Sequence, residues 1–135
     1  MDDQSSFAER KRRTRYQSAA LVTVKKKKWF REVKMEAALL DLSWQGFKIE
    51  LVDLPTIKFK NCDLLTLEIP LDTFKIMSPP TLEMSIVLKW YDPNRNRIGG
   101  IFYSPSENEF HILEKIINYL KKHKSFSTRA PQKAS

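Results

Sequence analysis

Apolar and polar residues alternate at period two in several stretches of the chain, a pattern typical of β-strands with one buried face. Together with short β-branched runs such as 19–24, these stretches give six expected strands, at 19–24, 29–42, 47–51, 64–69, 82–91 and 98–103. Turn-forming residues separate them, for example at 53–55, 78–80 and 92–96, and no helical period intervenes. Short strands at hairpin spacing predict a mainly β fold, a small antiparallel barrel of six strands.

The period changes after residue 103. Ser104 and Glu107 have the spacing of a capping box, with Pro105 as the expected first helical residue. Apolar residues then follow at helical spacing, namely Phe110, Leu113, Ile117 and Leu120. We therefore expect an amphipathic helix over 105–122 that lies on the barrel. The expected domain spans 10–122, with a basic arm at 10–15, the barrel at 16–103, and disordered ends at 1–9 and 123–135.

Length and composition exclude several classes of protein. A chain of 135 residues is enough for one domain, and three glycines cannot supply a Gly-rich phosphate loop. No apolar run approaches the ~18 residues of a membrane span, and the polar N-terminus is unlike a secretory signal. Cys62 is the only cysteine, which excludes an internal disulfide and a multi-cysteine zinc site. We expect a cytoplasmic protein that is not an enzyme and holds no metal or cofactor, since no acid, base and nucleophile assemble.

The charge is concentrated at the two ends of the chain. Residues 1–34 carry eleven Lys/Arg against four Asp/Glu, residues 35–120 carry eight against twelve, and residues 121–135 carry five and no acid. A duplex-binding domain more often has a basic face on its folded body. Basic ends on a mildly acidic body favour capture of a small, highly charged anion or a loose electrostatic contact, so nucleic acid is not the expected partner.

A lysine run at 25–28 precedes Trp29 and Phe30. Four like charges repel one another and prefer solvent, so this run is expected to be the connection between the first two strands. Contact with acidic lipid or RNA is the alternative, but four lysines hardly amount to a membrane anchor. The expectation is a solvated hairpin tip and no membrane partner.

Candidate binding chemistry lies at residues 41–46, where the chain turns after the second expected strand. Asp41, Ser43 and Gly46 supply an acid, a hydroxyl and a glycine, and the arm 10–15 supplies five cations in six residues. Ser43 can donate to a phosphate or purine acceptor, and Gly46 allows close approach of the backbone or a turn with positive φ. These residues fit a purine-nucleotide clamp. The alternative is a turn stabilised by Asp41 and Ser43 alone.

The Asp41-x-Ser43-x-x-Gly46 motif, the preceding basic arm and the late strand Ile98-Gly99-Gly100-Ile101-Phe102 together resemble PilZ domains, the bacterial receptor domains for cyclic di-GMP. The resemblance covers about residues 9–122. It implies a six-stranded antiparallel β-barrel with a C-terminal α-helix and a flexible basic N-terminal arm. The chain departs from the first family motif, R-x-x-x-R, because Lys11 stands at the first position and Arg15 at the second. Lysine keeps the charge but lacks the planar fork of arginine.

The resemblance implies that cyclic di-GMP is the ligand, bound by Arg10, Lys11, Arg15, Asp41, Ser43 and Gly46. Arg12 and Trp44 are further candidates, Arg12 if the arm slips by one residue and Trp44 by stacking on a base. An arginine fork reads guanine O6 and N7, at roughly 1–3 kcal/mol per contact, and Asp41 accepts from the guanine N1–H and N2–H₂ edge. Neutralisation by the ligand would order the arm and signal to an effector protein.

Two other functions remain open at this stage. One is a PilZ-like adaptor that has lost the nucleotide and works through protein contacts, which Lys11 favours. The other is non-specific nucleic-acid binding through the basic ends. Strongly salt-dependent binding that persists in Asp41→Ala would indicate the latter, since phosphate binding has no use for a carboxylate.

Overall fold

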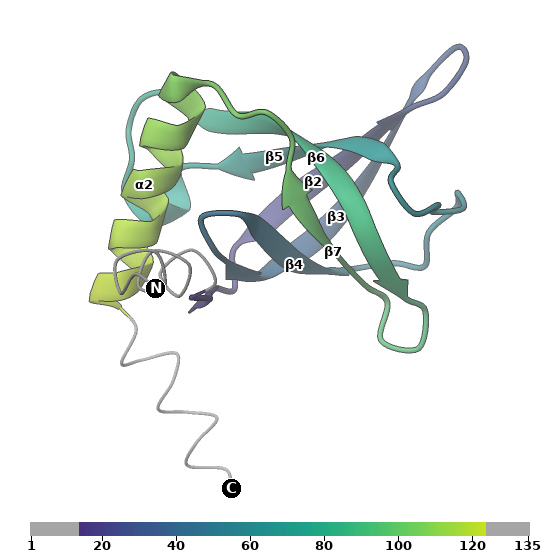
Figure 1. Ribbon diagram of the computed structural model, residues 1–135, viewed down its shortest axis with the longest axis horizontal. Coiled ribbons are helices and arrows are strands. Elements are labelled where there is room, and N and C mark those ends of the chain that lie inside the picture. The colour runs from purple at the N-terminus through teal and green to yellow at the C-terminus, as the bar shows by residue number, and fades with distance from the viewer. Residues whose placement is uncertain (1–13, 124–135) are drawn as a thin grey trace, which may run out of the picture.

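The computed structural model describes residues 14–123, so the expected disordered N-terminus, most of the basic arm and nearly all of the tail lie outside it. Within that range seven strands, one 3₁₀ helix and one α-helix form (Figure 1). The strands are β1 (Tyr16–Gln17), β2 (Leu21–Lys27), β3 (Glu32–Leu42), β4 (Gly46–Leu51), β5 (Leu64–Pro70), β6 (Thr81–Asp92) and β7 (Arg97–Phe102). The helices are η1 (Asp72–Phe74) and α2 (Glu107–Lys122).

Strands β2 to β7 close into an antiparallel barrel. The strand order runs β3-β2-β5-β6-β7-β4, and the pairing of β4 with β3 completes the circle. Closure leaves no long unpaired edge, which is how a small β domain avoids edge-to-edge association. The predicted six-stranded antiparallel barrel is confirmed. β1 was not predicted, and it pairs with the end of β3, with Tyr16 opposite Leu42 and Gln17 opposite Asp41.

The period-two residues fill the barrel interior, and α2 covers one end of it (Figure 1). Val33, Ala37 and Leu39 of β3 are buried, as their alternation predicts. The helix buries Ile112, Leu113, Ile116, Ile117 and Leu120. Phe74 of η1 contacts Tyr119 of α2 edge-on, which ties the β5–β6 connection to the helix. No helix within residues 14–123 is long and apolar enough to cross a membrane.

The expectation that the lysine run 25–28 forms the hairpin connection is wrong, because β2 continues to Lys27 and the turn lies at 28–31. Acids from distant segments neutralise the first two lysines. Lys25 Nζ lies 2.8 Å from Glu83 Oε2 and 3.4 Å from Glu68 Oε1, and Lys26 Nζ lies 2.9 Å from Asp63 Oδ2. The hydrogen bond between Lys25 and Glu83 raises the pKa of the lysine and lowers that of the carboxyl. Charge repulsion therefore does not end the strand.

The helix begins at Glu107, two residues later than expected, because a different serine caps it. The Ser106 hydroxyl accepts from the Glu109 N–H at 3.1 Å, and the Glu109 carboxylate accepts from the Ser106 N–H at 3.0 Å. Ser104 has a positive φ of 48°, whereas Ser106 has the extended backbone that an N-cap requires. The capping box predicted at Ser104 and Glu107 is therefore wrong in position. His123, expected in the disordered tail, closes the helix as its C-cap.

Candidate functional site

Two cations from different parts of the chain meet the Asp41 carboxylate near the end of β3. Arg15 Nη1 lies 3.0 Å from Asp41 Oδ1, and Lys48 Nζ lies 3.3 Å from Asp41 Oδ2. Lys48 reaches it because the β3–β4 hairpin places the two residues directly opposite each other. The Asp41 side chain is only 13% exposed, against 49% for Arg15. The result is a partly covered carboxylate with an accessible guanidinium above it.

The position of Arg15 depends on the residue that follows it. Tyr16 is buried in the core, and Lys121 of α2 lies over its ring at 5.9 Å from the centroid. Pairing of Tyr16 with Leu42 fixes the backbone of β1 against β3. Arg15 thus stands beside the motif 41–46, directly before the paired strand β1.

Ser43 has its hydroxyl engaged inside the turn. Its Oγ accepts from the Gly46 N–H at 3.0 Å and from the Gln45 N–H at 3.2 Å, and it donates to the Gly46 carbonyl at 3.3 Å. The residue is 2% exposed. The serine-stabilised turn considered from the sequence is therefore present, and it holds the β3–β4 hairpin in the register that brings Lys48 to Asp41.

Gly46 does not adopt a positive φ, so the turn with positive φ, one of the two roles expected for this residue, is wrong. A Cβ at this position would overlap the Gly100 carbonyl oxygen of β7. Glycine is needed here because the backbones of β4 and β7 approach closely at this point of their pairing. Its described role is packing between strands.

Trp44 packs on α2. Its ring meets Phe110 edge-on with centroids 5.4 Å apart, and its Nε1 is buried with no hydrogen-bond partner among the described residues. A cavity of about 340 Å³ adjoins it, lined by Trp44, Gln45, Ile101, Phe102, Pro105 and Phe110. Trp44 does not line the larger groove that contains Asp41.

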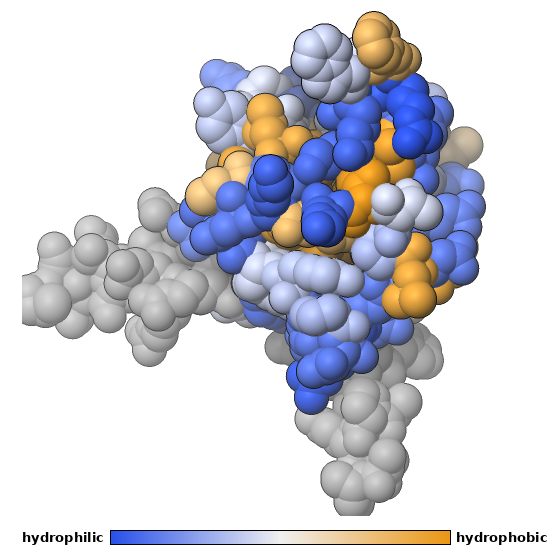
Figure 2. All heavy atoms as spheres, turned by 90° about the vertical axis from the view of Figure 1, so that its right-hand side faces the viewer, coloured by the Kyte–Doolittle hydropathy of each residue, from blue (hydrophilic) through white to orange (hydrophobic). Residues whose placement is uncertain are grey.

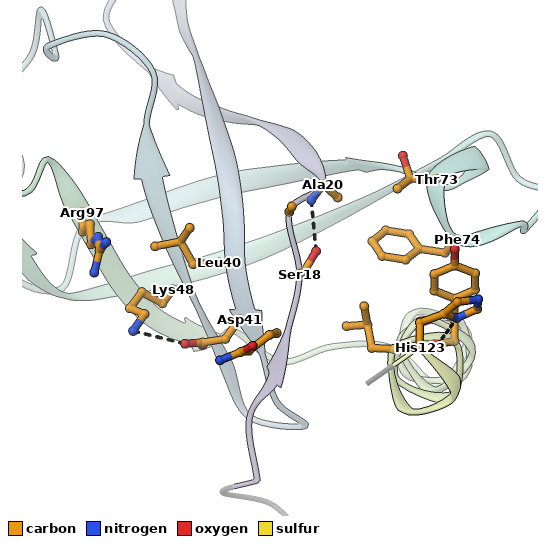
Figure 3. Close-up of a pocket in the computed structure, with 13 residues that line it drawn as sticks. Ser18, Ala20, Leu40, Asp41, Lys48, Thr73, Phe74, Arg97 and His123 are labelled. Carbon is orange, nitrogen blue, oxygen red and sulfur yellow. Dashed lines mark hydrogen bonds and ion pairs between the residues drawn. The ribbon is translucent and has the colours of Figure 1, made fainter. Parts of the chain in front are cut away.

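That groove has a volume of about 740 Å³ and extends from Asp41 to the end of α2 (Figure 3). The principal polar and aromatic lining residues are Asp41, Lys48, Arg97, Phe74, Tyr119 and His123. In Figure 3, Lys48 and Asp41 point toward one another on one side of Ser18, while Phe74 and His123 lie on the other side beside the helix. Arg97 Nε is 2.9 Å from Glu50 Oε1, so it contributes a paired cation. A wall of ion pairs that carries Lys48 and Arg97, together with an aromatic wall, suits an anion that carries planar rings.

The structure brings together only part of the predicted ligand set. Arg15 and Asp41 are in contact, and Ser43 and Gly46 form the adjoining turn. Arg10, Lys11 and Arg12 lie outside the described residues. Sequence reasoning missed Lys48, although a hairpin turn at 43–46 would have placed it opposite Asp41. The sequence does not indicate that Arg97 lines the groove, because the register of β7 against β4 cannot be predicted from it.

Comparison with known proteins gives matches among solved structures only. No family model and no curated protein matches the chain. The PilZ domain of YcgR from Escherichia coli, solved with c-di-GMP, has a TM-score of 0.63 and 14% identity, covering 86% of this chain and 95% of that one. The PilZ domain of CeSA from a cellulose-synthesizing bacterium has a TM-score of 0.58 and 12% identity, covering 80% and 98%. The Bacillus subtilis inhibitor of motility, MotI/DgrA, has a TM-score of 0.54 and 18% identity, covering 79% and 50%. The described chain therefore has the fold of PilZ domains.

Proposed function

We propose that this protein is a cyclic di-GMP receptor whose binding site is the groove beside Asp41. The observation that carries the proposal is the meeting of Arg15 and Lys48 at Asp41, in the turn motif that resembles that of PilZ domains. The similar PilZ domain of YcgR was solved with c-di-GMP, which supports the same ligand class here.

The chemistry of the cluster suits a guanine dinucleotide. A carboxylate has about four lone-pair sites, so Asp41 can accept from the guanine N1–H and N2–H₂ edge while it keeps one bond to each cation. Arg15 can turn its fork to guanine O6 and N7 or stack on the base, because half of its side chain is exposed. Lys48 and Arg97 supply positive charge for the phosphodiesters from inside the groove. Arg10, Lys11 and Arg12 would complete the charge from the arm.

The signal would be an ordering of the basic arm, passed to an effector protein in the cytoplasm. Five cations in residues 10–15 repel one another, and a ligand with two phosphates reduces that repulsion. The arm continues directly from Arg15, so ligand contacts at the groove and order in the arm would be coupled. A protein partner is in keeping with the similar protein MotI/DgrA, which is named as an inhibitor of motility.

Hydrogen exchange on the whole chain tests both parts of this proposal. Cyclic di-GMP should increase the protection of residues 8–17, whereas GTP at the same concentration should not. Asp41→Ala should lose the effect, and Asp53→Ala, which removes an exposed acid of the β4–β5 loop, should retain it. Equal protection with and without cyclic di-GMP in the unmodified chain would contradict the ordering mechanism.

A second candidate function is an adaptor that does not bind nucleotide. It is favoured by the Ser43 hydroxyl, which is already used within the turn, and by Lys11 in place of arginine. The two candidates differ in one respect that can be measured, since the adaptor requires no affinity for cyclic di-GMP.

A further inference from the structure

The tip of the β2–β3 hairpin exposes two large aromatic side chains. Trp29 is 91% exposed and Phe30 is 93% exposed, and their ring centroids lie 5.8 Å apart. The Lys28 N–H donates to the Arg31 carbonyl at 2.7 Å, which closes the turn beneath them. Both rings therefore project from an ordered turn without packing on the core.

Local turn formation does not account for these aromatics. Glycine, proline, asparagine, aspartate and serine are the residues that favour turns, and none of them occurs at 28–31. Large adjacent apolar side chains on a surface mark an interaction site more often than isolated ones do. The tip thus has a composition that suits contact with another surface.

Cations surround the tip. Lys27, Lys28 and Arg31 are exposed and form no ion pair with any residue in 14–123, and Glu32 is the only acid in residues 25–34. The β4–β5 loop adds exposed Lys58 and Lys60, and it is held beside β2 because Lys26 Nζ bonds both Asp63 Oδ2 and the Lys58 carbonyl. In Figure 2, which faces this end of the molecule, one hydrophobic group projects at the top beside a pale blue one, above a face on which hydrophilic side chains lie around further hydrophobic groups.

We propose that this hairpin tip docks on an anionic lipid surface, with Trp29 and Phe30 entering the headgroup region, which replaces the expectation of no membrane partner drawn from the lysine run alone. Aromatic side chains favour that region, and lysine and arginine are attracted to anionic lipids. Proteins that bind single-stranded nucleic acid instead place aromatics along a basic groove. The tip is a projection, and neither of the two cavities described above includes a tip residue.

The proposed lipid contact and the Asp41 groove are separate sites. The tip lies at the start of β3 and Asp41 lies near its end, which is about 30 Å away at the rise of a β-strand. A molecule docked by the tip therefore keeps its groove accessible. The lipid inference does not depend on nucleotide binding.

Sedimentation of the whole chain with lipid vesicles tests the inference. The protein should bind vesicles of equal parts phosphatidylcholine and phosphatidylglycerol. It should bind vesicles of phosphatidylcholine alone much more weakly. The double variant Trp29→Ala/Phe30→Ala keeps every charge and should bind at least about tenfold more weakly, because it loses two aromatic groups that insert. The variant Lys28→Ala/Arg31→Ala should lose about fivefold per cation.

Met77→Ala is the matched control, since Met77 is an 88% exposed apolar residue in the β5–β6 connection, on the α2 side of the barrel. Its binding should equal that of the unmodified chain. Equal vesicle binding by Trp29→Ala/Phe30→Ala would overturn the inference and assign the attraction to the basic ends. Absence of binding to the anionic vesicles would overturn the inference too. So would binding that depends on Trp29 and Phe30 but is found with oligouridylate and not with the vesicles.

Discussion

Arg15 Nη1 lies 3.0 Å from Asp41 Oδ1, so the residue that ends the basic arm contacts the acid that begins the turn motif. The two residues are separated by 26 positions in the chain and meet because β1 pairs with the end of β3. This ion pair connects the two sequence features on which the proposed function depends.

The Arg15–Asp41 pair should contribute little to stability. Arg15 is half exposed, and Lys48 also neutralises Asp41, so we expect a coupling of about 0.2–1 kcal/mol in a double-mutant cycle. Urea unfolding of Arg15→Ala, Asp41→Ala and the double variant measures it. Arg95→Ala is the control, since it removes an exposed arginine paired with Asp92 in the β6–β7 turn. A coupling above about 2 kcal/mol would instead make this pair a structural element like a buried one.

Ser43→Ala should destabilise the fold. The substitution leaves the buried Gly46 N–H without its partner, at a cost of about 1–3 kcal/mol. Ser85→Ala, at an exposed position of β6, should change the free energy of unfolding by less than about 0.5 kcal/mol. If Ser43→Ala were as mild as Ser85→Ala, the hydroxyl would not hold the turn, and a role in ligand contact would gain support.

Gly46→Ala should weaken the pairing of β4 with β7. Its Cβ would overlap the Gly100 backbone carbonyl, which cannot move without disturbing the strand pairing, so we expect a loss of about 1–3 kcal/mol. At Gly99 the neighbour is the side chain of Trp90, which is 42% exposed and can shift. Thermal unfolding should therefore show a smaller loss for Gly99→Ala, and the reverse order would contradict this account.

Asp63 should make stability depend on pH in the acid range. Partial burial alone would raise its pKa, but the hydrogen bond from Lys26, together with that from the Lys60 N–H, lowers the pKa below 3.8. A lowered carboxyl pKa contributes stability above the unfolded value, and that contribution is lost as pH falls through the folded value. Asp63→Ala should cost about 1–2 kcal/mol at neutral pH and less as the pH falls below 3.8.

Urea unfolding at several pH values checks this prediction. Asp53→Ala in the same loop is the control, because the Asp53 side chain is exposed and has no ion pair within 14–123. If the difference in free energy of unfolding between Asp63→Ala and the unmodified chain stayed constant down to low pH, the charge of Asp63 would not be the source of its stabilising effect.

Much of the fold could be predicted because period-two alternation directly reports which side chains face the core. The continuation of β2 through Lys25 and Lys26 could not be predicted, since the acids that neutralise these lysines lie 58 and 37 residues away. Two serine–glutamate pairs at capping-box spacing compete near the helix start, and only the backbone conformation of Ser104 and Ser106 decides between them. β1 is too short, at two residues, to show any alternation.

The sequence could indicate only those residues of the candidate site that belong to one local motif. Asp41, Ser43 and Gly46 lie within one turn, so the sequence brings them together without further information. Arg97 enters the groove through the register of β7 on β4, with Glu50 opposite it. The helix end contributes Tyr119 and His123 through the packing of α2, which periodicity alone does not orient on the barrel.

Titration calorimetry of cyclic di-GMP against the unmodified chain, Arg15→Ala and the control Arg95→Ala tests the proposed function most directly, with GTP as the control ligand. We predict micromolar or tighter binding to the unmodified chain and to Arg95→Ala, and no binding of GTP. Arg15→Ala should lose about tenfold or more, as expected for one bidentate or stacked arginine contact. Absence of binding to the unmodified chain, or equal affinity in Arg15→Ala, would contradict the proposed site, and absence of binding would favour the adaptor.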